Sequence, residues 1–99
     1  MSHYILKDKQ IIKTDLMGWA KWAEENNSNR IIKYSPVTGI VSVSTVFLGL
    51  DHNHTGYGEP VLFETMIFGG EHDGYQERYT TYEEAEAGHD KAVEMIFEV

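Results

Sequence analysis

The sequence lacks cysteine entirely, has only two prolines, and carries eight Lys and Arg residues against sixteen Asp and Glu. The absence of cysteine excludes disulfides and thiolate chemistry, so packing must stabilise the fold, and a reducing cytoplasm fits best. No apolar run is long enough for a signal peptide or a membrane span, which predicts a cytoplasmic protein that makes no membrane contact. At this length we expect a single domain, residues 1–99, with one core.

Positive charge is scarce and unevenly placed. Residues 1–50 carry six Lys and Arg against four Asp and Glu, whereas residues 51–99 carry two against twelve. A formal net charge of −8 repels a phosphate backbone, so we expect no duplex nucleic acid as a partner. The acidic half forms a solvated helix face, holds a metal or docks on a basic partner.

The first third of the chain predicts a hairpin, a helix and a strand. The apolar segments 4–6 and 11–12 flank a polar stretch, which is typical of a short hairpin. Asp15 precedes apolar residues that recur with the spacing of one helix face, and this helix should end in the polar cluster 26–29. Residues 31–34 favour a strand.

Two long runs rich in β-branched and aromatic residues, 40–50 and 61–69, predict a pair of antiparallel strands joined by a polar loop. Pairing that is symmetric about this loop predicts Phe47 opposite Glu64. That register places four side chains on one face of the sheet: Thr45, Phe47, Glu64 and Met66. Residues 70–79 are expected to form a loop.

The C-terminal segment predicts a helix that begins with a capping box, Thr81 to Glu84. His89 falls within the apolar stripe of this helix and should therefore face the sheet. The expected fold is α+β: a mostly antiparallel sheet of four to five strands with two helices packed on one face. The uncovered apolar face predicts a homo-oligomer, with a dimer as the first expectation.

Titratable side chains near the predicted strand ends and on the second helix suggest a site. His52 and His89 could act as acid and base, with Glu64 or Asp51 orienting an imidazole. The alternative is that a buried carboxylate such as Glu64 merely satisfies His89, without chemistry. Arg78 could grip a phosphate at the start of the second helix.

Metal and cofactor binding have weaker support. His52 and His54 are spaced to point the same way in an extended segment, yet no zinc-type motif such as HExxH occurs, so no metal is predicted. The glycine clusters do not form a phosphate-binding loop followed by a helix, and we expect no cofactor. Trp19 and Trp22 lie three residues apart, so one should pack in the core while the other packs there too or lines a groove where a base could stack.

Three strings in the chain, VSTVFLGLDH from Val43, PVLFETMIFGG from Pro60 and RYTTYEEAEAGH from Arg78, resemble those of a family of small, uncharacterised phage and prophage proteins. The resemblance implies a family position for six residues that could be functional: Asp51, His52, Glu64, Arg78, Thr81 and His89. The loop 53–59 departs from the family, which removes support for His54 as a ligand.

By analogy with other small phage proteins, the resemblance implies an anti-defence protein of the host cytoplasm that sequesters or cleaves a nucleotide second messenger. The ligand would then lie in a pocket formed by His52, Glu64, Arg78 and His89, with Asp51 and Thr81 beside it. Two alternatives remain open at this stage. One is a metal-independent or metal-assisted hydrolase that uses the histidine pair, and the other is an acidic accessory factor that inhibits a host protein.

Overall fold

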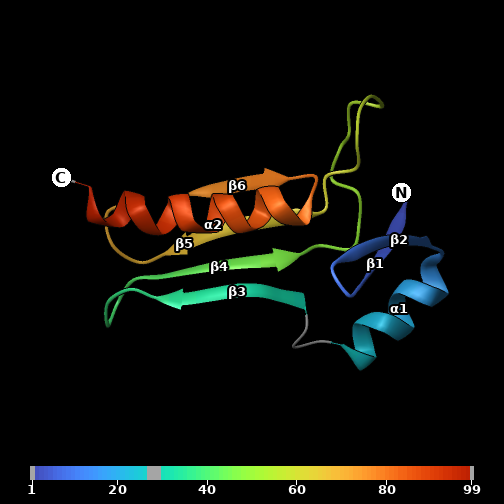
Figure 1. The fold of residues 1–99 in the computed structure, drawn as a ribbon, viewed down its shortest axis with the longest axis horizontal. Coiled ribbons are helices and arrows are strands. Elements are labelled where there is room, and N and C mark those ends of the chain that lie inside the picture. Colours follow the sequence, from blue (N-terminus) through green and yellow to red (C-terminus); the bar gives the residue numbers. More distant parts are fainter. Residues whose placement is uncertain (1, 27–29, 99) are drawn as a thin grey trace.

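A computed structural model describes residues 2–26 and 30–98. In chain order its elements are β1 (His3–Lys7), β2 (Gln10–Thr14), α1 (Leu16–Glu25), β3 (Ile31–Pro36), β4 (Ser42–Phe47), β5 (Phe63–Phe68), β6 (Gln76–Tyr79) and α2 (Tyr82–Phe97). The predicted α+β class is confirmed, because the strands form a four-stranded and a two-stranded antiparallel sheet, both accompanied by helices (Figure 1). Of the two helices in these residues, neither is long and apolar enough to cross a membrane.

The N-terminal hairpin forms where the sequence predicts it. β1 and β2 pair antiparallel with Lys7 opposite Gln10, so that Asp8 and Lys9 alone make the turn. Helix α1 begins directly afterwards, with the Asp15 carboxylate accepting a 2.7 Å hydrogen bond from the third residue of the helix. Its predicted end falls partly on residues 27–29, which lie outside the described residues.

The larger sheet has the strand order β3-β4-β5-β6. Its last strand lies in the segment 70–79, for which we expected only a loop, and that expectation is wrong for residues 76–79. The reason is compositional: three of the four residues of β6 are polar or charged and mostly exposed, so the strand lacks the apolar alternation by which strands are recognised.

The pairing of β4 with β5 is antiparallel, as predicted, but its register differs from the predicted one. Phe47 lies opposite Phe63, and Glu64 lies opposite Val46. The predicted register is therefore wrong by one residue, and such a slip moves every side chain of one strand to the other face of the sheet. Glu64 and Met66 lie on the face opposite to Thr45 and Phe47.

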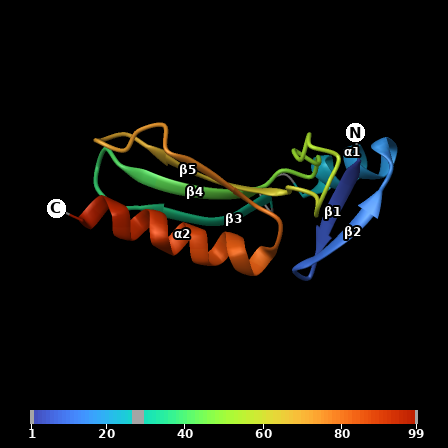
Figure 2. The same ribbon diagram turned by 90° about the horizontal axis from the view of Figure 1, so that it is seen from above.

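Helix α2 covers one face of the four-stranded sheet, as Figure 2 shows from above. The side chains that β4 and β5 send toward the helix are fully buried: Val43, Thr45, Phe47, Phe63, Thr65 and Ile67. They meet the buried residues of α2, Ala85, His89 and Ala92, which confirms the predicted stripe. Burial of each large apolar side chain contributes about 1.5–3 kcal/mol, so this interface supplies most of the apolar stabilisation of the sheet.

The hairpin and α1 pack at one end of the same core. The Tyr4 N–H donates to the Gly49 carbonyl oxygen over 2.7 Å, which ties β1 to the segment that follows β4. From α1, the Trp22 ring meets Phe47 edge-on with 5.4 Å between centroids. The hairpin, α1, β3 and the start of α2 thereby surround a common space, at the right of Figure 1.

Candidate functional site

The six residues predicted to form a site lie in four different parts of the fold. Glu64 and Arg78 are brought together: on neighbouring strands, the Arg78 Nε donates to a Glu64 carboxylate oxygen over 2.9 Å. The Gln76 side-chain amide also donates to that oxygen. Arg78 thus points away from α2 and does not lie at the start of that helix, because the alternation of β6 places Tyr79 and not Arg78 on the helix side.

His89 lies on the other side of the sheet, with no exposed surface. Its Nε2 is 2.9 Å from the Ser35 hydroxyl and its Nδ1 is 2.7 Å from the Thr45 hydroxyl, which in turn lies 2.5 Å from that of Thr65. Burial lowers the pKa of His89, and the Lys33 ammonium lowers it further. The partners of His89 are therefore hydroxyls and not the Glu64 carboxylate, and the ring is closed off from solvent.

The remaining three predicted residues already serve local structure. The Thr81 hydroxyl accepts from the Glu84 N–H over 3.1 Å and caps α2, as the sequence predicts. Asp51 accepts from the N–H groups of Asn53 and Val61, closing the base of the loop.

The His52 Nδ1–H donates a hydrogen bond of 2.7 Å to the Leu50 carbonyl oxygen. The structure thus gives His52 and His89 separate partners and does not join them in one pocket with Glu64 and Arg78. In residues 2–26 and 30–98, no three His, Asp or Glu side chains are grouped so as to hold a metal ion.

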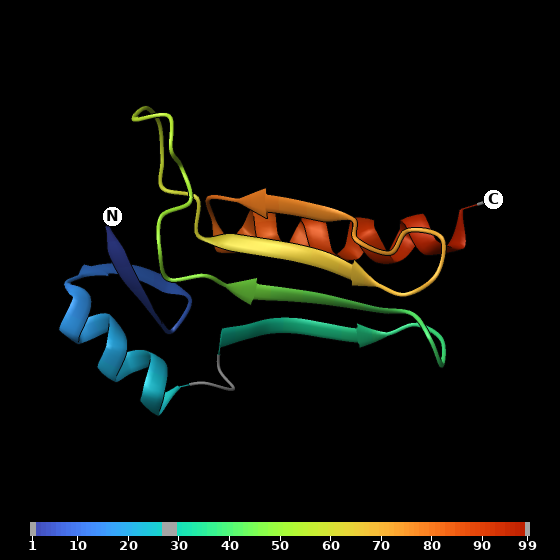
Figure 3. The same cartoon turned by 180° about the vertical axis from the view of Figure 1, so that it is seen from behind.

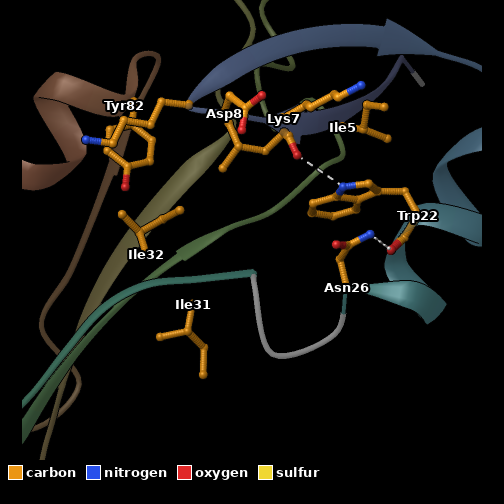
Figure 4. Close-up of a pocket in the computed structure, with 10 residues that line it drawn as sticks. Ile5, Lys7, Asp8, Trp22, Asn26, Ile31, Ile32 and Tyr82 are labelled. Carbon is orange, nitrogen blue, oxygen red and sulfur yellow. Dashed lines mark hydrogen bonds between the residues drawn. The ribbon is translucent and has the colours of Figure 1, made fainter.

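A groove of about 510 Å³ with a chemically mixed lining lies beside the N-terminal hairpin, and we term it the hairpin groove. Its walls include apolar, aromatic and basic side chains: Ile5, Lys7, Lys9, Trp22, Ile32 and Tyr82. Figure 4 shows Trp22 and Tyr82 on opposite sides of the groove, with Ile32 on the same side as Tyr82. This volume falls in the range of about 300–1,000 Å³ that is typical of small-molecule sites.

The rings of Trp22 and Tyr82 that line the hairpin groove are held in place by contacts with the hairpin and the core. The Trp22 indole N–H donates to the Leu6 carbonyl oxygen over 3.1 Å, and the ring rests on Phe47. The Tyr82 ring meets Phe63 edge-on at 6.1 Å. Both rings are half-buried, so each keeps a surface that a ligand can contact without rearrangement of the core.

The rim of the hairpin groove is basic, although the protein is acidic. Lys7 and Lys9 lie on it with Asp8 between them, and the Lys9 ammonium lies 5.4 Å from the centre of the Tyr82 ring. A cation at this distance is attracted to the face of the ring. Lys9 is an exposed residue, so its ammonium can also meet an anion at the rim.

The turn that presents Lys9 is in a disfavoured conformation. Asp8 and Lys9 have φ values of 50° and 66°, as a two-residue type I′ turn requires. Asparagine and glycine are the residues that usually occupy such a turn, and a lysine in the left-handed region costs about 1 kcal/mol. Backbone strain of this kind is concentrated at binding and catalytic sites.

The sequence predicts only part of this groove. The spacing of the two tryptophans indicates that Trp22 can line a groove, whereas nothing in the expected elements points to Lys7, Lys9 or Tyr82. The available signal was the pair Asp8-Lys9 between two apolar segments, where turn chemistry favours Asn-Gly. Comparisons with protein-family models, with curated proteins and with solved structures found no match to this chain.

Proposed function

We propose that this protein binds a small nucleotide-like ligand in the hairpin groove. The observation that carries the proposal is the combination of two opposed aromatic rings, Trp22 and Tyr82, with the ammonium of Lys9 at the rim. Aromatic rings stack on a planar base, and a lysine ammonium attracts a phosphate. The groove therefore offers separate surfaces to the two halves of a nucleotide.

The biological role that we propose follows from the resemblance to small phage proteins. In that role the protein acts in the host cytoplasm as an anti-defence factor and sequesters a nucleotide second messenger. We favour binding over cleavage, because neither predicted histidine is free for acid–base chemistry. His89 is buried, and His52 is hydrogen-bonded to the Leu50 carbonyl oxygen. Self-association is also part of the proposal, and the surface for it is described in the next subsection.

A fluorescence titration tests the proposal directly. Trp22 lines the groove, so a base stacked on it should quench its emission. Trp19→Phe removes the second indole, whose N–H has no hydrogen-bond partner within the described residues, and leaves Trp22 as the only reporter. The probes are AMP, cyclic AMP and cyclic di-AMP, with inorganic phosphate as the probe that lacks a base.

We expect saturable quenching by at least one nucleotide and none by inorganic phosphate. Tyr82→Leu keeps the apolar contact with Phe63 and removes the stacking surface, which should weaken binding about 5- to 150-fold if stacking contributes about 1–3 kcal/mol. Lys9→Ala should also weaken binding, whereas Lys21→Ala, an exposed lysine on α1, is the matched control. Absence of quenching by every nucleotide up to about 1 mM contradicts the proposal.

Chromatography of the same incubations separates binding from the hydrolase alternative. If the nucleotide is recovered intact after release from the protein, sequestration is supported. If a product appears and its formation stops in His52→Ala, the hydrolase alternative replaces our proposal.

A further inference from the structure

Neither helix of the described residues crosses the second face of the four-stranded sheet, as Figure 3 shows from behind. We term this side of the sheet the open face. Its central side chains come from β4 and β5 and point away from α2: Ser44, Val46, Glu64, Met66 and Phe68. We infer that the open face is the surface on which a second copy of this chain docks, with the two sheets packed face to face.

The shape of the open face fits a second copy of itself. The five central side chains line a hollow of about 160 Å³, and one of them, Phe68, is 48% exposed. A hollow of this size is close to the volume of an aromatic side chain. A two-fold axis that lies in the interface, midway between hollow and ring, places each Phe68 over the hollow of the other copy.

The charge of the open face also favours a second copy. On strands β3 to β6, Glu64 and Arg78 are the only charged side chains that point to this side, and they form an ion pair with each other. The protein as a whole has a formal net charge of −8, so two copies repel each other over most of their surfaces. The open face is neutral, so a second copy meets no net charge repulsion there.

The size of the open face determines how tightly we expect two copies to associate. With strands about 4.8 Å apart and a rise of about 3.3 Å per residue, it measures about 14 by 20 Å between the outer strand axes. This is smaller than the roughly 800 Å² per partner of a standard interface. The dimer should therefore be reversible, with a dissociation constant in the micromolar range.

Sedimentation velocity from about 5 to about 500 µM is the first test, chosen to bracket that dissociation constant. We expect the sedimentation coefficient of the wild-type protein to rise with concentration toward that of a dimer. Phe68→Lys puts a charge into the hollow and should keep the protein monomeric throughout. Met17→Lys changes a residue on α1 that is 77% exposed, so it is the matched control and should dimerise like the wild type.

Cross-linking identifies the face. Because the chain has no cysteine, Ser44→Cys introduces a single thiol on the open face, and Ala20→Cys introduces one on the exposed side of α1. Packed sheets lie about 10 Å apart, so a bismaleimide of about that span should join two copies of Ser44→Cys and none of Ala20→Cys. A wild-type protein that remains monomeric, a dimer that survives Phe68→Lys, or cross-links at Ala20→Cys alone would overturn the inference.

The inference names the surface for the self-association included in the proposed function, and it is tested separately from nucleotide binding. Nucleotide quenching of Trp22 can be measured on Phe68→Lys, whose change lies on the opposite side of the sheet from the core that supports Trp22. Loss of dimerisation with retained quenching would assign the two properties to separate surfaces. Failure of quenching in the wild type would leave the dimer test unaffected.

Discussion

Replacing His89 with alanine perturbs a polar ring that lies buried between α2 and the sheet. The variant loses two hydrogen bonds, to the hydroxyls of Ser35 and Thr45, each contributing about 0.5–1.5 kcal/mol. It also leaves a cavity of roughly 60 Å³, which at about 24 cal/mol per Å³ adds about 1.5 kcal/mol. We therefore expect His89→Ala to lower the free energy of unfolding by about 3 kcal/mol, a large share of the 5–15 kcal/mol typical of a domain.

The same residue makes stability depend on pH. Burial lowers the pKa of His89, with the Lys33 ammonium as the second cause and the Asp90 carboxylate acting in the opposite direction. The unfolded chain binds a proton on this ring near the usual pKa of about 6.5, whereas the folded protein keeps the ring neutral to lower pH. The contribution of His89 is therefore fully present above about pH 6.5 and is lost as the pH falls from there through the lowered folded pKa.

Urea unfolding followed by circular dichroism, repeated between about pH 5 and pH 8, measures both effects. The wild type should lose stability as the pH falls through this range, and His89→Ala should be less stable but flatter with pH. His54→Ala changes an exposed loop histidine and is the control, expected to follow the wild-type curve. If His89→Ala lowers the free energy of unfolding by less than about 1 kcal/mol, or keeps the pH dependence of the wild type, the role of the buried hydroxyl network is refuted.

Further variants test single contacts. Thr81→Ala should cost about 1 kcal/mol in urea unfolding, because Thr81 caps α2; an unchanged midpoint would place the helix start elsewhere. Gly88→Ala should lower the melting temperature although alanine favours helices, because its Cβ would meet the Tyr79 ring. Tyr79→Phe removes a buried hydroxyl without a hydrogen-bond partner in the described residues, and its melting temperature should not fall. Lys9→Gly should raise stability by about 1 kcal/mol, because it relieves the left-handed strain, while weakening nucleotide quenching; a loss of stability would show that the turn is unstrained.

The parts of the fold that sequence analysis predicted correctly depend on contacts within a few residues. The side chains of Asp15 and Thr81 each accept a hydrogen bond from the backbone N–H three residues ahead. Both helix starts can therefore be predicted from the sequence. The hairpin closes over Asp8 and Lys9 between two apolar segments. The helix stripe that contains His89 follows from the helical period alone.

The parts that failed depend on the register between distant strands. Whether Glu64 faces α2 or the opposite side depends on a single residue in the connection between β4 and β5, and the chain leaves β4 at Phe47 but enters β5 at Phe63. Symmetric pairing about the loop is one of two registers that the apolar pattern allows, because both strands carry apolar residues on both faces. The predicted pocket used Glu64 and His89 together, so this single shift separated its members.

The hairpin groove lay beyond sequence analysis for a different reason: four segments distant in the chain supply its walls. Three observations nonetheless concern the position of Lys9 in this groove. Lys9 is held at a φ of 66° by the tightness of the turn, its ammonium lies over the Tyr82 ring, and the chain around it is acidic. A glycine at this position would relieve the strain but would remove the cation. This combination of strain and positive charge at one position is the reason that we propose the hairpin groove, and not His89, as the ligand site.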